Sequence, residues 1–575
     1  MSQQKKTITK WLPIVGQLED YSRDKCISDV IAAVVVTVML IPQSLAYAIL
    51  AGLPPQYGLY ASILPIVIYS LLGTSTSLAV GPVAIASIMT ASALSSVVDT
   101  GLVSYVEGAI TLAFLSGAIL FVMGLLKFGF VANFLSHSVV SGFITASCLI
   151  IALGQLRHLL GVNAAGDTFF ELCISLLDSL NGTNTPTLMI GGASLLFLVA
   201  TRKYAVRILK LLGAKKIVAV SVARMSPIFA VIATTVVVAS FSLNEQGVAI
   251  VGEVPAGIAE FSLPSINLAV LQALFLPAFF IAIIGYVESI SVGRTLGAKR
   301  NERVDSNQEL IALGGSNIAS GFAGAFPVTG GFSRSVVNYD AGAQTQFAGI
   351  YTALGIAVAS MMLTPYLFYL PIAMLAATIV VAVLALIDLS IFKHTWHFSK
   401  SDFIAVIITV LFTLAAGVEA GVGAGIVVSI ALHLYHTSKP HVAEIGLVPD
   451  TGHFRNIKHY QVDLIPKTVS LRIDESLIFS NANYLESYVY DILAERPETQ
   501  NIILHFGAVN TIDFSGIEMM LSLNKQLLGR GVKLHLSEVK TPVKQLLKKA
   551  NLISALGGEL YMSHLQAHEV LKISN

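Results

Sequence analysis

The stretch "AFPVTGGFSRSVVNYDAG", Ala325 to Gly342, joins an apolar run to a polar helical pattern inside the most hydrophobic part of the chain. Pro327 ends the apolar run, and two glycines, Gly330 and Gly331, follow it. Proline and glycine interrupt a membrane helix, and a new helix is expected from about Phe332. The stretch therefore predicts a half-helix that begins inside the membrane.

A second stretch, "LAVGPVAIAS", Leu78 to Ser87, has the same layout. An extended apolar segment meets Gly81 and Pro82 and then becomes helical, and proline suits the first turn of a helix. The two stretches lie about 250 residues apart, which is more than half of the apolar region. This spacing predicts two related halves, each with one short half-helix.

The composition indicates a membrane protein. Of 575 residues, 55% are hydrophobic and only 12% are charged, and the mean hydropathy is +0.76. Apolar runs long enough to cross a bilayer recur from Ile27 to Tyr435, and we count about 14 spans, several of them interrupted by glycine or proline. The expected location is a cell membrane, plasma or inner, crossed many times and in contact with membrane lipid.

Lysine and arginine concentrate in short cytoplasmic loops, so their positions predict the orientation. All the basic clusters follow an even number of expected spans, which predicts that both the N-terminus and the C-terminus are cytoplasmic. These clusters are the N-terminal segment (Lys5, Lys6, Lys10, Arg23, Lys25), the loop after the sixth span (Arg202, Lys203, Arg207, Lys210, Lys215, Lys216, Arg224), the loop after the eighth (Arg294, Lys299, Arg300, Arg303) and the loop after the twelfth (Lys393, Lys400).

Charged residues and strand-like alternation return near the C-terminus, which divides the chain into three parts. We expect an N-terminal cytoplasmic segment at 1–25, a transmembrane domain at 26–438 and a cytoplasmic α/β domain at 439–575. In the last part "KTVSLRI" alternates like a half-buried strand, and "NIILHFGAV" reads as a central strand. The helix that follows is expected to bury Ile517, Met520, Leu521, Leu527 and Leu528.

Half-helices that begin within the membrane direct unpaired amide groups and a positive dipole end at whatever lies between them. Repeat-built transporters hold anions near the midplane in this way. Arg334, between Ser333 and Ser335, adds a full positive charge at the second half-helix, and an arginine within a span is costly unless it has a function. The alternative is that Arg334 pairs with an acid such as Asp340 or Glu288.

Glu288, in "FFIAIIGYVESISVGRT", is the other buried ionisable group. Desolvation among apolar neighbours favours the neutral carboxyl, so Glu288 is a candidate to take up a proton near neutral pH and carry it with an anion. A permanently protonated, purely structural glutamic acid is the alternative.

The stretch "IPQSLAYAILAGLPPQYGLYAS", Ile41 to Ser62, places Pro42, Gln43, Ser44 and Tyr47 within the first span. Polar side chains in hydrocarbon are costly unless they face protein or a watery cavity. We therefore expect a break in the first span that faces a cavity, with a simple proline kink as the alternative.

These motifs resemble those of the SulP sulfate permeases, called solute carrier family 26 in animals. "IPQSLAYAILAGLPPQYGLYAS", "AVGPVA" and "TGGFSRSVVN" are similar to the family's first-span, third-span and tenth-span motifs, and the tail, with "TIDFSGIEMM", is similar to a STAS domain. The resemblance covers essentially the whole chain. It implies an α-helical polytopic fold of two inverted repeats of seven spans, arranged as a core domain and a gate domain, followed by a cytoplasmic STAS domain.

The resemblance also implies roles for individual residues. Gln43 and Tyr47 would line the anion site from the first span, Val83 would offer a backbone amide from the third, and Ser333 and Arg334 would do so from the tenth. Glu288 matches an acidic position associated with proton coupling in the sulfate-transporting branch.

The predicted function is secondary active transport of a small oxyanion, with proton-coupled sulfate uptake by alternating access as the favoured form. Bicarbonate, dicarboxylate or chloride exchange, an uncoupled anion channel, and a scaffold acting through the tail are the alternatives. A homodimer and a cytoplasmic partner of the STAS domain are further expectations.

We find no motif for an enzyme, a cofactor, a metal or a nucleic acid. The three cysteines, Cys26, Cys148 and Cys173, indicate no disulfide framework.

Overall fold

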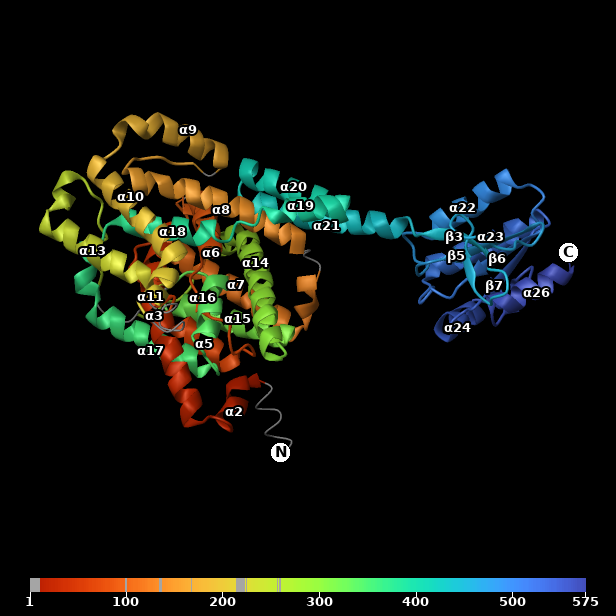
Figure 1. Ribbon diagram of the computed structural model, residues 1–575, viewed down its shortest axis with the longest axis horizontal. Helices are drawn as coiled ribbons and strands as arrows, with labels where there is room; N and C mark the ends of the chain where they lie inside the picture. Colours follow the sequence, from red (N-terminus) through yellow and green to blue (C-terminus); the bar gives the residue numbers. More distant parts are fainter. Residues whose placement is uncertain are drawn as a thin grey trace. The chain divides into compact units, whose positions relative to one another are not determined.

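The computed structural model describes residues 11–98, 101–133, 137–166, 168–213, 223, 225–255, 257 and 260–574. Of the basic residues named above, Lys5, Lys6, Lys10, Lys215, Lys216 and Arg224 lie outside these ranges. The chain divides into two compact units, Met1–Ser429 and Ile430–Asn575, here called the membrane unit and the C-terminal unit (Figure 1).

The first half of the membrane unit contains α2 (Pro13–Leu18), α3 (Arg23–Leu50), α4 (Gln56–Tyr60), α5 (Leu64–Leu72), β1 (Val80–Gly81), α6 (Ala84–Val98), α7 (Tyr105–Leu125), η1 (Phe128–Asn133), α8 (His137–Leu160), α9 (Phe169–Ser179), η2 (Leu180–Gly182), α10 (Thr185–Ala200), η3 (Thr201–Ala205), α11 (Val206–Leu211), α13 (Ser226–Ser240) and η4 (Leu243–Gln246). The second half contains α14 (Leu268–Arg300), α15 (Ser306–Phe322), β2 (Thr329–Gly330), α16 (Phe332–Asp340), α17 (Phe347–Met362), η5 (Thr364–Leu367), α18 (Ile372–Leu384), α19 (Ser390–Phe398), α20 (Lys400–Ala416) and α21 (Val418–Ser438).

Many of these helices are suited to a bilayer. Within the described ranges, six are long and apolar enough to cross one: Arg23–Leu50, Tyr105–Leu125, Ser138–Leu160, Thr185–Leu211, Leu268–Arg300 and Ala420–Ser438. Shorter apolar helices, such as Ala84–Ser95 and Ile372–Leu384, accompany them. Helices too short to span alone are tolerated at membrane depth only where protein or a cavity surrounds them. The number of spans stays a prediction.

The helices of the membrane unit pack in two groups that interleave along the sequence. In the core group, which comprises α3 to α7 and α14 to α17, α15 packs on α7 and α5, α14 on α7 and α6, and α17 on α3. In the gate group, which comprises α8 to α11, α13 and α18 to α20, α18 and α20 pack on α8, and α10 packs on α18. Each half of the chain contributes to both groups, and α18 contacts α3 where the groups meet.

The first span differs from the expectation. Pro42 lies inside α3, which continues as a single helix of 28 residues, so the predicted break is wrong. Proline removes one amide donor and leaves the carbonyl four residues earlier unpaired, but the turns on both sides keep their hydrogen bonds. The inward orientation is present, because Ser44 and Tyr47 are both buried.

The C-terminal unit contains β3 (Val442–Leu447), β4 (Phe454–Asn456), β5 (Thr468–Ile473), α22 (Ala482–Glu495), β6 (Asn501–His505), α23 (Phe514–Gly529), β7 (Lys533–Ser537), α24 (Thr541–Lys549), α25 (Leu552–Ala555), β8 (Leu560–Tyr561) and α26 (His564–Ser574). Its six strands form one sheet in the order β4-β3-β5-β6-β7-β8. Strands β5 to β8 are parallel, and β3 is antiparallel to both of its neighbours.

Both faces of this sheet are covered. Ile502 and Leu504 of β6 pack in the cluster that includes residues of α22 and α23, whereas Ile503, between them, packs with Ala567 and Leu571 of α26. The predicted strands at "KTVSLRI" and "NIILH" are present, and β5 alternates buried and half-buried residues as expected.

The predicted buried face of α23 is only partly right. Met520 and Leu527 are buried, but Leu528 is 46% exposed, and Met519 and Leu523 take the inner positions instead. Residues 516, 519, 520, 523 and 527 follow the spacing of one helical stripe, which is rotated by about one position from the predicted one.

Candidate functional site

Two extended segments cross in the core group and bring the two half-helices together. β1 pairs antiparallel with β2, with Val80 opposite Gly330 and Gly81 opposite Thr329. Gly81 has a φ of +150°, a conformation that favours glycine. α6 and α16 begin directly after these strands, as predicted from the proline and glycine residues. The first turns of both half-helices therefore lie on either side of one crossing.

Polar side chains of α14 and α15 hold the crossing in place. Ser289 Oγ accepts from the backbone N–H of Gly330 at 2.8 Å and donates to the Gly285 carbonyl at 2.6 Å. Asn317 bonds both backbone groups of Val328, accepting from its N–H at 2.8 Å and donating to its carbonyl at 2.9 Å. Extended backbone inside a membrane protein must find such partners, because lipid offers none.

A cavity lies beside the crossing, between the core group and the gate group. Its lining residues are Gln43, Tyr47, Pro82, Val83, Ala84, Ile85, Glu288, Gly331, Phe332, Ser333, Arg334, Ala382, Val383 and Leu386. The structure thus brings all six residues singled out from the sequence to one cavity. The core group supplies the charged and polar residues, and α18 with the segment after it supplies an apolar wall.

Arg334 is the cation of this cavity, and only 3% of its surface is exposed. Its Nε donates to the carbonyl of Ala79 at 3.3 Å, while Nη1 and Nη2 have no hydrogen-bond partner among the described residues. Gly81 and Gly331 make room for the guanidinium, because a Cβ on either would lie 3.0 Å from one of the two Nη atoms. A buried guanidinium with free donors is a strong site for an oxyanion.

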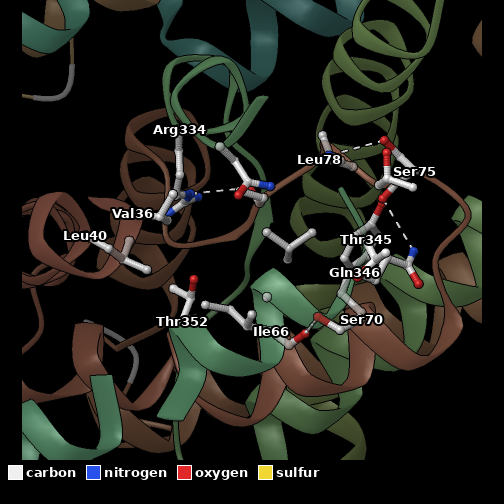
Figure 2. A pocket seen from close by; sticks show the side chains of 16 residues that line it. Val36, Leu40, Ile66, Ser70, Ser75, Leu78, Arg334, Thr345, Gln346 and Thr352 are labelled. Carbon is white, nitrogen blue, oxygen red and sulfur yellow. Dashed lines mark hydrogen bonds between the residues drawn. The ribbon is translucent and has the colours of Figure 1, made fainter. Parts of the chain in front are cut away.

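The same guanidinium also lines a second, small cavity. Figure 2 shows Arg334 at one side of it, with Ser75, Thr345 and Gln346 opposite. Gln346 donates to the carbonyl of Gly73, but its Oε1 is buried without a partner in the described part of the chain. A polar cavity of this kind suits water.

Glu288 lies on α14 and lines the first cavity together with Arg334. Its Oε2 is buried, and no described residue hydrogen-bonds it. The pairing of Arg334 with Glu288 that the sequence left open is therefore not formed through this oxygen or through the Nη atoms. The cavity holds a cation and a carboxyl group that are both available to a ligand or a proton.

Sequence reasoning did not single out Ser289 or Asn317, and it named Ser335 only as a neighbour of Arg334. Ser335 Oγ accepts from the N–H of Ala79 at 2.9 Å and so ties α16 to the strand of the other half. Each is one polar residue on a helix, and its partner is a backbone group outside that helix, 11 residues away for Asn317, 41 for Ser289 and 256 for Ser335. Among the described residues, no group of three or more His, Cys, Asp or Glu side chains is arranged to hold a metal ion.

Comparison with known proteins agrees with this architecture. Residues 26–409 match the Sulfate permease family, and residues 459–567 match the STAS domain. Sulfate transporter 4.1, chloroplastic, of Arabidopsis thaliana is 31% identical over 558 residues, which cover 95% of this chain and 79% of that protein. High affinity sulfate transporter 2 of Stylosanthes hamata is 32% identical over 563 residues, covering 95% of this chain and 84% of that one.

Among solved structures, murine solute carrier 26 family member A9, an anion transporter in the inward-facing state, superposes with a TM-score of 0.89 at 25% identity. The match covers all of this chain and 96% of that one. Because the family match extends over more than half of the chain and the relatives exceed 30% identity, the chain belongs to the sulfate permease family and carries a C-terminal STAS domain.

Proposed function

We propose that this protein is a secondary active transporter of a small oxyanion, with sulfate as the favoured substrate. The observation that supports this most is the single cavity shared by the starts of α6 and α16 and the guanidinium of Arg334. Two helix N-termini contribute roughly half a positive charge each, and Arg334 contributes a full one. Together they offset part of the cost of desolvating a dianion.

Each residue has a defined role in the proposed site. Arg334 binds the oxyanion through its free Nη atoms, and the backbone N–H groups near Val83 and Ser333 donate hydrogen bonds to it at the two helix starts. Gln43 and Tyr47 of α3 add side-chain donors. The relatives named above as sulfate transporters favour this substrate, while bicarbonate, a dicarboxylate or chloride would use the same contacts.

Glu288 is the proposed proton-coupling group. Its carboxyl shares the cavity with Arg334, so a proton on Glu288 removes a negative charge that would repel the incoming anion. Proton uptake and anion binding are then mutually favourable, which is the requirement for symport.

The position of the cavity supports transport by alternating access. Its polar groups belong to the core group, and its opposite wall, Ala382, Val383 and Leu386, belongs to α18 and the segment after it. An anion held by the core group can move with that group relative to the apolar wall. We further propose cytoplasmic termini, a homodimer in a cell membrane, and a cytoplasmic partner for the STAS domain, with the division at 1–25, 26–438 and 439–575.

The test is uptake of radiolabelled sulfate into proteoliposomes under an imposed pH gradient, with bicarbonate, oxalate and chloride as competitors. The proposal expects saturable uptake that concentrates sulfate when the outside is acidic. Flux that carries current but never accumulates sulfate inside the vesicles above its outside concentration would establish a channel instead. Unchanged flux after Arg334→Ala would show that transport does not depend on this guanidinium, and absence of sulfate flux in the wild type would favour a protein that acts through its tail.

A further inference from the structure

A larger space, here called the vestibule, adjoins the cavity that contains Arg334. The two spaces share Gln43, Phe332, Ser333, Ala382 and Leu386. The remaining lining residues of the vestibule are Met39, Leu198, Arg202, Val206, Ala223, Ser226, Pro227, Val336, Val337, Thr378, Val381 and Ala385. Any solute that uses this opening to reach Arg334 passes these residues first.

Arg202 carries the only charge among the described residues that line the vestibule. The other lining residues are apolar, or are neutral polar residues such as Gln43 and Ser226. Low-dielectric walls focus the field of a charge between them and raise the local concentration of counter-ions. Arg202 is exposed, so its guanidinium is open to anions that enter the vestibule.

The local backbone positions this side chain. Arg202 lies in the π-helical segment η3, between α10 and α11, and π-helical turns occur often at functional sites. Its Nη1 donates to the carbonyl of Val381, in the last turn of α18, at 2.9 Å. Arg202 and its partner Val381 both belong to the gate group, whereas Arg334 belongs to the core group.

We infer that Arg202 forms a second, outer anion station in the vestibule, for small oxyanions on their way to or from Arg334. This inference rests on the proposed function and adds a site on the gate side. Because the two guanidinium groups lie on different helix groups, movement of the core group changes the distance between the stations. Arg202 then sets how readily an anion enters or leaves from the vestibule and leaves the central contacts to Arg334.

A purely structural role is the competing explanation, since Arg202 also ties η3 to the end of α18. Three variants separate the two roles. Arg202→Gln removes the charge and keeps an N–H donor, and Arg202→Lys keeps the charge. Lys203→Gln is the matched control, because Lys203 is the adjacent basic residue, lies 5.3 Å from the Tyr204 ring centroid and does not line the vestibule.

The experiment measures radiolabelled sulfate flux in inside-out and right-side-out membrane vesicles, at low and high concentrations of sodium gluconate. In inside-out vesicles at low salt, Arg202→Gln should raise the KM for sulfate about 3- to 10-fold and leave kcat within about 2-fold. The KM difference should shrink below about 2-fold in ~0.3 M salt, because screening is then strong. Arg202→Lys and Lys203→Gln should behave as the wild type.

Two results would overturn the outer station. One is an Arg202→Gln KM and salt dependence equal to those of Lys203→Gln. The other is a fall in kcat at unchanged KM, shared by Arg202→Lys, which would assign Arg202 to holding α18. A wild-type protein without saturable sulfate flux in either orientation would instead overturn the proposed function, and this inference with it.

Discussion

Val80 pairs with Gly330 in an antiparallel bridge, although the two residues come from different halves of the chain. The bridge fixes the starts of α6 and α16 at one point, so that their dipoles end at the same cavity. A change at the crossing should therefore affect both half-helices together, and not only the one in which it is made.

Loss of the guanidinium should weaken anion binding most. Arg334→Gln removes a charge-assisted contact worth about 1.5–3 kcal/mol, which corresponds to a roughly 10- to 100-fold rise in the Kd for sulfate. Equilibrium binding of radiolabelled sulfate to the purified protein measures this. Arg294→Gln is the control, since Arg294 bonds Ser306 and does not line the cavity. Equal sulfate affinities in the two variants would show that Arg334 does not bind the anion.

Replacement of Glu288 should remove the pH dependence of sulfate uptake. A glutamine imitates the protonated carboxyl at every pH, so Glu288→Gln should still carry sulfate but lose the increase in uptake that the wild type shows as the medium becomes more acidic. Initial rates of proteoliposome uptake at a series of pH values give the profile. Glu253→Gln, at an exposed position, should keep the wild-type profile. A Glu288→Gln profile that follows the wild type would assign the coupling to another group.

A methyl group beneath the guanidinium should displace it. The Cβ of Gly331→Ala would lie 3.0 Å from Nη2 of Arg334 and 3.2 Å from Cγ1 of Val83. Overpacking of this kind costs about 1–3 kcal/mol, so we expect a roughly 5- to 100-fold loss of sulfate affinity. Gly192→Ala, where no atom lies within 4 Å of the added Cβ, should bind normally. Wild-type affinity in Gly331→Ala would mean that the guanidinium has room to move aside without cost.

Acid should destabilise the C-terminal unit through His564. Burial, with smaller contributions from His505 and His568, lowers the pKa of His564 from 6.5 to about 3. The folded form holds the imidazole in its neutral state. The free energy of unfolding of the C-terminal unit therefore keeps its full value above about pH 6.5 and falls as the pH drops toward 3, with a loss of about 2 kcal/mol at pH 5. Ser537 bonds the Nδ1 of this ring at 2.7 Å, and Glu538 accepts from its backbone N–H at 3.4 Å.

Hydrogen exchange of the β6 and β7 amides in the full chain measures this loss, after correction for intrinsic exchange rates. His564→Gln should flatten the pH dependence of protection between pH 5 and 7.5, even if it lowers protection at every pH. His459→Gln, at an exposed position, should leave the dependence unchanged. Equal pH slopes in the wild type and His564→Gln would exclude this histidine as the sensitive group.

The starts of both half-helices were predictable because proline and glycine act on the local backbone. At each start proline and glycine stand close together, Gly81 with Pro82 and Pro327 with Gly330 and Gly331, and such combinations are stronger signals for the end of a helix than a single proline. The continuity of α3 through Pro42 was not predictable in the same way, since the neighbouring helical turns decide whether a proline breaks a span or is only accommodated.

A sequence pattern also does not predict the hydrogen-bond partners of single polar residues. In the sequence, Ser289 is a small polar residue within an apolar helix. Its hydrogen bond with Gly330 forms only because β2 folds back against α14. The register of Val80 with Gly330 depends in the same way on how the two halves come together. Local patterns thus predict which segments break, and tertiary packing decides what they touch.

Asn317 should be the most sensitive of these supporting residues. It is 2% exposed and satisfies both the N–H and the carbonyl of Val328, which precedes β2. Asn317→Ala leaves these two buried backbone groups unpaired, at about 1–3 kcal/mol each, so we expect a clear drop in thermal stability and at least a 10-fold loss of transport.

Ser316→Ala is the matched control, because Ser316 donates only to the Ala312 carbonyl of its own helix, and it should change stability by less than about 1 kcal/mol. Thermal unfolding in detergent and sulfate uptake, measured on the same preparations, compare the two. If Asn317→Ala were as stable and active as Ser316→Ala, water or a shifted strand would be serving Val328, and the crossing would depend on Ser289 and Ser335 instead.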